Sequence, residues 1–96
     1  MPVMYYRFEV VCELLEFSRP QLRRYVQAGL IEASGEPEER GGPGRFTEDD
    51  LRRARRIRRL ERDLGLNLAG LEVVMGLIDQ VEALQRQLAE TPRRPS

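Results

Sequence analysis

Arginine is the residue type through which this sequence could do most of its chemistry. All 16 basic residues are arginine, and 16 acidic residues offset them. The charges are segregated: residues 32–50 hold seven acids against two arginines, a net charge of −5, and residues 51–64 hold seven arginines against two acids, a net charge of +5. A basic helix directly after an acidic loop indicates either a solvated face with local ion pairs or a surface that attracts a charged partner.

The residue types that are missing exclude several kinds of active site. Without histidine or lysine, the chain has no catalytic His dyad, imidazole metal ligand, Schiff base or P-loop ammonium. The single cysteine, Cys12, lies on an apolar stripe and is expected to be buried and inert. Glu48, Asp49 and Asp50 could bind a hard cation, but acids in the first turn of a helix are better explained by the helix dipole. We therefore expect no enzyme, no cofactor and no metal site.

The length of 96 residues suits one small domain with a modest core that a partner subunit could enlarge. No apolar run approaches the roughly 20 residues that span a bilayer. No basic-then-apolar signal peptide opens the sequence either. A soluble cytoplasmic protein is the expectation.

Apolar spacing predicts a mainly α fold that begins with a helix-turn-helix. The first short helix has one apolar stripe, made by Phe8, Val11, Cys12 and Leu15. A break follows, and Ser18 is a good N-cap for a second helix that has Pro20 in its first turn. The buried stripe of that helix is predicted to be Leu22, Tyr25 and Val26, and Gly29 ends it.

A small β-hairpin wing is predicted next. Leu30–Ala33 could form one strand, Ser34–Gly44 must be a loop because of its glycines and prolines, and Arg45–Phe46 could return as the second strand. Thr47 then caps a third helix, with Asp50 completing an approximate capping box. The inward stripe of this helix is predicted to be Leu51, Ala54, Ile57, Leu60 and Leu64.

The last helix is predicted to hold two copies of the chain together. Gly65 stops the third helix, Asn67 is the next N-cap, and the new helix runs from Leu68 to about Ala89. Its apolar residues have heptad spacing, which predicts an antiparallel dimer seam of Val74, Leu77, Val81, Leu84 and Leu88. The alternative is that the helix folds back on its own core. The predicted organisation is therefore a winged helix-turn-helix domain (1–66), a dimerisation helix (67–90) and a disordered tail (91–96).

Two motifs in this order resemble the MerR-type winged helix. The stretch Leu22–Leu30 reads LRRYVQAGL and resembles the family's L-R-x-Y-E-x-x-G-L recognition-helix motif. The stretch Arg45–Leu51 reads RFTEDDL and resembles the R-[YF]-[ST]-x-x-D-[LIV] junction between wing and helix. The resemblance covers about residues 5–90 and implies a winged helix-turn-helix fold with a C-terminal dimer helix.

Two branches of that superfamily compete. The stretch Asp63–Leu71 (DLGLNLAGL), with LIDQV after it, is most similar to chaperone modulators of the CbpM type, which bind the J-domain of a DnaJ-like co-chaperone in the DnaK system. The same NLAG stretch with VEAL after it is also similar to HspR, a dimeric DNA-binding repressor of chaperone operons. Both branches imply chaperone biology, with a protein partner in one and operator DNA in the other.

The two branches imply different surfaces. A DNA or partner surface would use Arg19, Arg23, Arg24, Tyr25 and Arg45. A J-domain surface would use Glu36, Glu38 and Glu39 together with the exposed part of the last helix. Each has a plainer interpretation: solvated helix for the arginines of the second helix, partial core packing for Tyr25, and a solubilising loop for the glutamates. The wing departs from the family pattern at Pro43 and Gly44, and the chain has no net basic charge. These departures favour the chaperone modulator, with the HspR-like regulator as the alternative.

Overall fold

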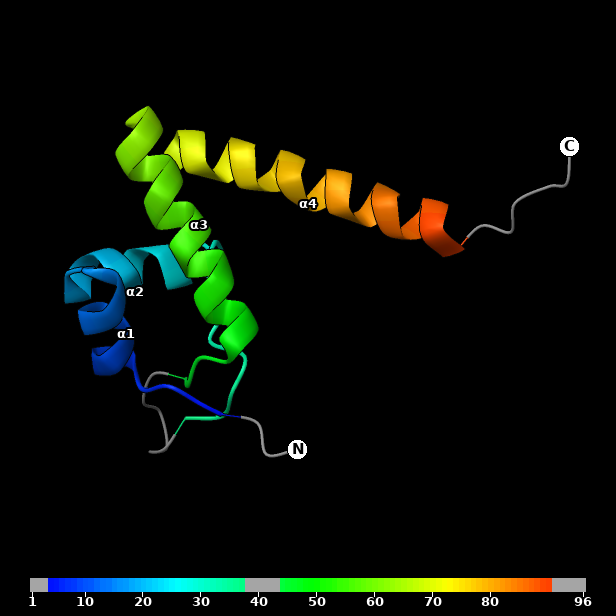
Figure 1. Cartoon of the computed structure of the whole chain (residues 1–96). Helices are drawn as coiled ribbons and strands as arrows, with labels where there is room; N and C mark the ends of the chain where they lie inside the picture. The colour runs from blue at the N-terminus through cyan, green and yellow to red at the C-terminus, as the bar shows by residue number, and fades with distance from the viewer. Residues whose placement is uncertain (1–3, 38–43, 91–96) are drawn as a thin grey trace, which may run out of the picture.

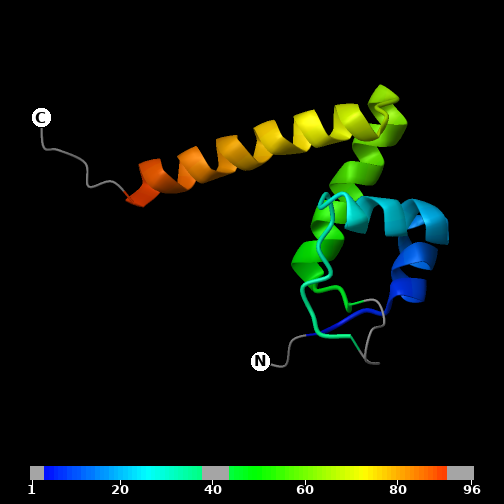
Figure 2. The same ribbon diagram turned by 180° about the vertical axis from the view of Figure 1, so that it is seen from behind.

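Four helices make up most of the chain, and one of them projects away from the other three. The computed structural model describes residues 4–37 and 44–90. The helices are α1 (Phe8–Leu15), α2 (Arg19–Gln27), α3 (Glu48–Leu64) and α4 (Leu68–Glu90). Figures 1 and 2 show α1 and α2 packed beside α3, whereas α4 leaves the end of α3 and extends away from the cluster. The fold is mainly α, as the sequence predicts.

The predicted helix-turn-helix is present, with the predicted caps. Glu16 adopts a left-handed conformation (φ 58°) after α1 and turns the chain toward α2. The hydroxyl of Ser18 accepts a hydrogen bond from the backbone N–H of Gln21 at 3.2 Å and so caps α2. Gly29 follows α2 with φ 77°, a conformation that costs glycine little. The turn between α1 and α2, and both ends of α2, are therefore determined by residues within or next to them in the sequence.

The core lies where α1, α2 and the first half of α3 meet. The predicted stripes of α1 and α2 face it, with Val26 only partly buried. In α3 the stripe is buried from Leu51 to Ile57 and partly buried at Leu60. The prediction is wrong for Leu64, which is 63% exposed because the last turn of α3 extends past the packed helices. The buried apolar residues are Phe8, Val11, Cys12, Leu15, Phe17, Leu22, Tyr25, Leu30, Ile31, Phe46, Leu51, Ala54, Ile57, Leu71 and Met75.

The segment between α2 and α3 differs from the predicted hairpin. Leu30–Ala33 is not a strand, because the N–H groups of Leu30 and Ile31 both turn back to the carbonyl of Tyr25 and close the end of α2. Antiparallel bridges join Gly35 to Arg45 and Tyr6 to Phe46 instead. The N-terminal segment, rather than Leu30–Ala33, is therefore the partner of Phe46. The full hairpin stays a prediction, since its tip (38–43) is outside the described residues.

The last helix has the predicted start and length. Asn67 accepts a hydrogen bond from the N–H of Gly70 at 2.9 Å, after Gly65 has ended α3 with φ 63°. Leu71 and Met75 are buried against the core. Ile78 still packs against the core, and Asp79 and Glu82 pair with arginines of α3. After Glu82 the helix extends away from its own domain, so the alternative weighed for it does not describe the second half of α4. The domain division at residue 66 stays a prediction, and the expected tail (91–96) lies outside the described residues.

Candidate nucleic-acid interface

The outer face of α2 carries three arginines that are open to solvent. Arg19, Arg23 and Arg24 are exposed, and the helix contains no acidic residue. Within residues 4–37 and 44–90, the structure gives these three side chains no hydrogen bond and no ion pair. The structure therefore places three of the predicted contact residues together, on the exposed face of the second helix of a helix-turn-helix.

Tyr25 is not on that face, which corrects its assignment to the contact surface. Its side chain is 5% exposed and packs edge-on against Phe17, with ring centroids 5.7 Å apart. Its hydroxyl donates a hydrogen bond to the Glu61 carboxylate. Burial, and then this hydrogen bond, raise the pKa of Tyr25. Three residues beyond the buried Leu22, Tyr25 falls on the inner side of α2 and positions the helix instead of contacting a partner.

Polar side chains fasten the inner side of α2 to α3. The amide of Gln21 donates to both carboxylate oxygens of Glu61, at 3.0 and 2.9 Å. The guanidinium of Arg58 pairs with the same carboxylate at 2.6 Å and lies 5.4 Å from the centre of the Phe17 ring. Sequence reasoning missed this cluster. The only local signals were the spacing of Gln21 from Tyr25 on one helical face and of Arg58 from Glu61 on another.

The arginines of α3 differ from those of α2, because most of them are already paired. The acids come from α4, from the turn after α1 and from α3 itself, so the +5 segment is largely neutralised within the fold. This confirms the interpretation as local ion pairs for five of its seven arginines. The pairs are Arg52–Asp49, Arg53–Asp79, Arg56–Glu82, Arg58–Glu61 and Arg62–Glu16.

One buried carboxylate fastens the described ends of the segment between α2 and α3, where the wing is predicted, to α3. Asp50 is 7% exposed and accepts hydrogen bonds from the N–H and hydroxyl of Ser34 and from the N–H of Thr47, at 2.8 to 3.0 Å. The hydroxyl of Thr47 in turn accepts a hydrogen bond from the N–H of Asp50, which completes the predicted capping box. Asp50 thus holds the start of the acidic loop, and its place in the first turn of α3 needs no metal to explain it.

The remaining predicted surface residues belong to this segment. Arg45 is half-buried and, with Tyr5, Ser34 and Glu36, lines a hollow of about 420 Å³. Glu36 is exposed, whereas Glu38 and Glu39 lie outside the described residues. A Cβ on Gly44 would be 2.9 Å from Ala33, so the departure from the family wing at this position is required by the close approach of the two chain segments.

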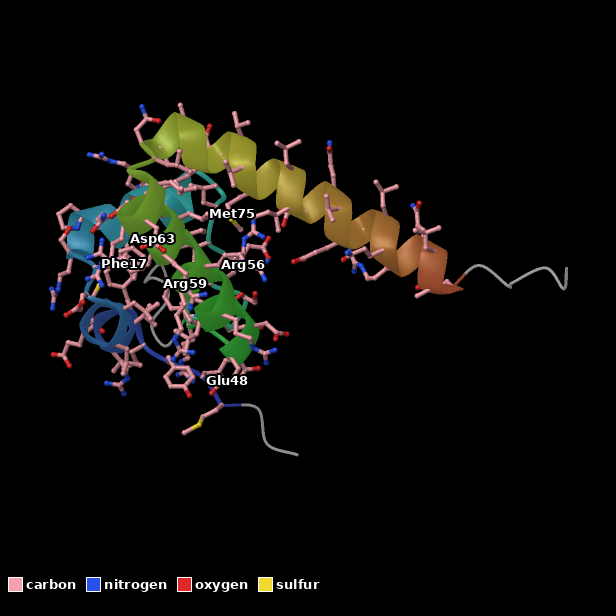
Figure 3. All side chains as sticks on the ribbon, turned by 45° about the horizontal axis from the view of Figure 1, so that its top comes forward. Phe17, Glu48, Arg56, Arg59, Asp63 and Met75 are labelled. Atoms are coloured by element: carbon pink, nitrogen blue, oxygen red, sulfur yellow. The ribbon has the colours of Figure 1, made fainter. Side chains whose placement is uncertain are left out.

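The predicted seam of α4 is exposed within a single copy. Val74 is half-buried, and Leu77, Val81, Leu84 and Leu88 are 51 to 75% exposed. A mostly apolar groove of about 430 Å³ runs beside the first part of the seam; Figure 3 shows Arg56, one of its lining residues, on the side of α3 that faces α4. These side chains share one face, as predicted, and their burial by a second copy stays a prediction.

Two further properties concern possible ligands and membranes. Among the described residues, no three histidine, cysteine, aspartate or glutamate side chains are grouped closely enough to hold a metal ion. In the same part of the chain, every helix is too short or too polar to cross a membrane. The expectation that the protein is not an enzyme is untested by either property.

Comparison with known proteins agrees with this geometry. The family model described as MerR HTH family regulatory protein matches residues 6–93. A protein of Streptomyces coelicolor assigned as the heat shock protein HspR is 33% identical over 86 residues, which are 88% of this chain and 54% of that protein. The chain thus spans about half the length of this curated relative. No solved structure matches. With its helix-turn-helix and the family match over nearly its full length, the chain belongs to the MerR HTH family of regulatory proteins.

Proposed function

We propose that the protein is a dimeric, DNA-binding regulator of heat-shock genes. The observation that carries the proposal is the exposed set of Arg19, Arg23 and Arg24 on the second helix of the helix-turn-helix, three side chains with no ion pair to any described residue. In proteins of this architecture that helix enters the major groove, where guanidinium groups contact phosphates and guanine edges. The relative named as a heat shock protein supports the class of target gene. Binding to chromosomal DNA would place the protein in the cytoplasm.

The three arginines of α2 provide enough charge for strong DNA binding only if two copies of the protein bind together. Strong DNA-binding proteins neutralise roughly 6–10 phosphates, and each contact adds about 0.9 to the slope of log affinity against log salt. Three arginines from each of two copies give six contacts, a slope of about −5. Arg45 at the base of the predicted wing would add one more contact from each copy. The exposed seam from Val74 to Leu88 supplies the surface by which two copies would join.

The arginines of α3 do not weaken this proposal. Most of them are paired with acids of the same chain, namely Asp79, Glu82, Glu61 and Glu16, so the proposal does not need them as contacts to DNA. The neutral total charge, which favoured a protein partner at the level of sequence, therefore conceals a locally basic face on α2.

A chaperone modulator, the function that the sequence favours, has less support. It rests on Glu36, Glu38 and Glu39 together with the exposed part of the last helix. Of the three glutamates, only Glu36 lies among the described residues. The relative's name fits a heat-shock protein and does not mention a DnaJ-like co-chaperone or DnaK. Binding to a J-domain protein in place of DNA is accordingly the alternative result in the experiment that tests DNA binding.

The test is to select duplexes from a randomised DNA pool and to measure affinity for the selected sequence at several salt concentrations. Arg23→Gln should weaken binding and reduce the salt slope by about 1.8, because a dimer loses two phosphate contacts. Arg86→Gln is the matched control, since it removes the same charge from an exposed position on the projecting helix. Failure to enrich any sequence, together with tight binding to a purified J-domain protein, would replace this proposal by the modulator function.

A further inference from the structure

Arg53 contacts two parts of the fold that are far apart in sequence. Its Nε donates a hydrogen bond to the carbonyl of Leu30 at 2.6 Å. Its two terminal nitrogens donate to the two carboxylate oxygens of Asp79, at 2.6 and 3.0 Å. A two-pronged bond of this kind fixes direction as well as distance, because both groups are planar. One side chain in α3 thus joins the end of α2 to α4.

The contact with Leu30 is a contact with the end of the recognition helix. Leu30 directly follows Gly29, and its N–H returns to the carbonyl of Tyr25, so it belongs to the closing turn of α2. Its side chain is 5% exposed and lies in the core. A movement of Leu30 would therefore move the C-terminal end of α2 with it.

The contact with Asp79 is made where α4 leaves the core. Leu71 and Met75 anchor the helix before this point, and the exposed seam continues after it at Val81. The hydrogen bond with Arg53 lowers the pKa of Asp79, and the same bond raises the pKa of Arg53. Both groups are therefore charged near neutral pH. The pair is partly shielded, with side chains 30% and 48% exposed.

We propose that Arg53, through Leu30 and Asp79, fixes the direction of α4 relative to the recognition helix and so determines which half-site separation the dimer accepts. This inference rests on the proposed function. In a two-fold dimer joined through α4, the direction of that helix sets the distance and rotation between the two copies of α2. Half-site spacing follows from that geometry. Arg53 is a positioning residue, since it need not touch DNA.

The neighbouring pair Arg56–Glu82 provides a matched control. It joins the same two helices, with each residue three positions after its counterpart. Its single hydrogen bond of 2.8 Å is exposed, at 52% and 50%, and no described contact links Arg56 to the end of α2. If any ion pair between α3 and α4 sufficed, the two pairs would behave alike.

The first test measures affinity for a series of operators whose half-sites are moved apart or together by one base pair at a time. The unmodified protein should prefer one separation by about tenfold or more over its neighbours, since each step also rotates one half-site about the duplex. Arg53→Gln and Asp79→Asn should reduce this preference to about threefold or less, whereas Arg56→Gln and Glu82→Gln should keep it. Arg53→Lys, which retains the charge but not the planar fork, should fail to restore it.

The second test needs no DNA. Spin labels on Gln27→Cys in α2 and Gln80→Cys in α4, in labelled chain diluted with unlabelled chain, report the separation of the two helices. The distance distribution should be narrow, should broaden in Arg53→Gln and should stay narrow in Arg56→Gln.

The outcomes separate this inference from the function on which it rests. If the unmodified protein binds no DNA, the proposed function fails, and the spin-label distances still decide whether Arg53 orients α4. If it binds DNA and the Arg53 and Asp79 variants lose affinity equally at every half-site separation, the inference is overturned and the function stands. Equal broadening in the Arg56 variant would overturn it too. Asp79→Asn keeps the test valid should Arg53→Gln fail to fold.

Discussion

The hydroxyl of Tyr25 donates its hydrogen to the carboxylate of Glu61, and this bond joins the recognition helix to α3 across 36 positions of sequence. Gln21, one turn earlier in α2, donates to the same carboxylate. Apolar burial favours contact between α2 and α3 but has no preferred direction of its own, whereas hydrogen bonds do. The hydrogen bonds to the shared carboxylate supply this preference, so the outward direction of Arg23 and Arg24 depends on a group that they never touch.

Removing the hydroxyl should therefore weaken the fold without leaving a large cavity. For Tyr25→Phe we expect a loss of about 1–2 kcal/mol in the free energy of unfolding, measured with urea, because a bond to a charged acceptor is lost. The loss stays in that range because Glu61 keeps Gln21 and Arg58 as partners. Tyr5→Phe, at a position that is 48% exposed, is the control and should change little. Equal stability of the two variants would contradict this role of Tyr25.

The exposed face of α4 should be buried in a dimer. Leu84 is 58% exposed, so Leu84→Asp removes little packing within one copy but would place a charge in the predicted seam. We expect sedimentation equilibrium to give a dimer for the unmodified protein and a monomer for the variant, with unchanged helix content. Arg86→Asp puts an acid on the opposite side of α4 and should leave the dimer intact. A monomeric unmodified protein would disprove the seam.

Cys12 should be protected in the folded protein. Burial raises the pKa of its thiol, and the side chain is only 8% exposed. Because the thiolate is the reactive form, we expect a disulfide reagent to modify Cys12 more than about tenfold more slowly in the native protein than in urea. A cysteine placed at the exposed Gln27 should react rapidly under native conditions. Equally fast native modification of Cys12 would show that α1 opens readily.

The Arg53–Asp79 pair should make stability depend on pH on the acid side. The hydrogen bond from Arg53 lowers the pKa of Asp79, so folding favours the ionised carboxylate. That contribution is fully present above the ordinary value of about 3.9 and is lost as the pH falls through the lower value in the folded protein. The difference in unfolding free energy between the protein and Asp79→Asn should be about 1 kcal/mol near neutral pH, because the pair is partly exposed.

The pH profile provides its own control. The difference between the protein and Asp79→Asn should stay constant down to about pH 5 and shrink below about pH 4. Arg53→Gln should show the same profile, because the pKa of Asp79 is lowered mainly by Arg53. A difference that persists undiminished at pH 3 would mean that Asp79 acts through packing instead of charge.

The parts of the fold that depend on neighbouring residues could be predicted from the sequence. Ser18, Thr47 and Asn67 cap their helices with side chains that reach only three residues ahead, so the sequence alone contains both partners of each bond. The pairing of Tyr6 with Phe46 could not be predicted, because the partners are 40 positions apart and nothing local fixes their register. The predicted strand at Leu30–Ala33 was wrong for a different reason, because the N–H groups of Leu30 and Ile31 close the end of α2 instead.

In the candidate interface, too, the residues placed by local helical spacing could be predicted and those placed by long-range contacts could not. Helical periodicity placed Arg23 and Arg24 outside and Leu22 inside, and the structure agrees. The likeness of Tyr25 to a family motif suggested a contact residue, whereas its spacing from Leu22 favoured burial, and the spacing was correct. Glu61 and Arg53 were missed because their roles depend on the crossing of helices, which is a property of packed side chains and not of any one segment.

The part of α4 after Asp79 determines how precisely that helix must be oriented. Ten residues lie between Asp79 and Glu90, and at a rise of about 1.5 Å per residue this arm extends about 16 Å past Asp79. A rotation of about 10° at the Arg53–Asp79 brace would sweep the end of such an arm through about 3 Å, close to the 3.4 Å rise of one base pair. For the proposed function, therefore, the contacts of Arg53 would have to hold the direction of α4 to within about 10° if adjacent half-site separations are to be distinguished.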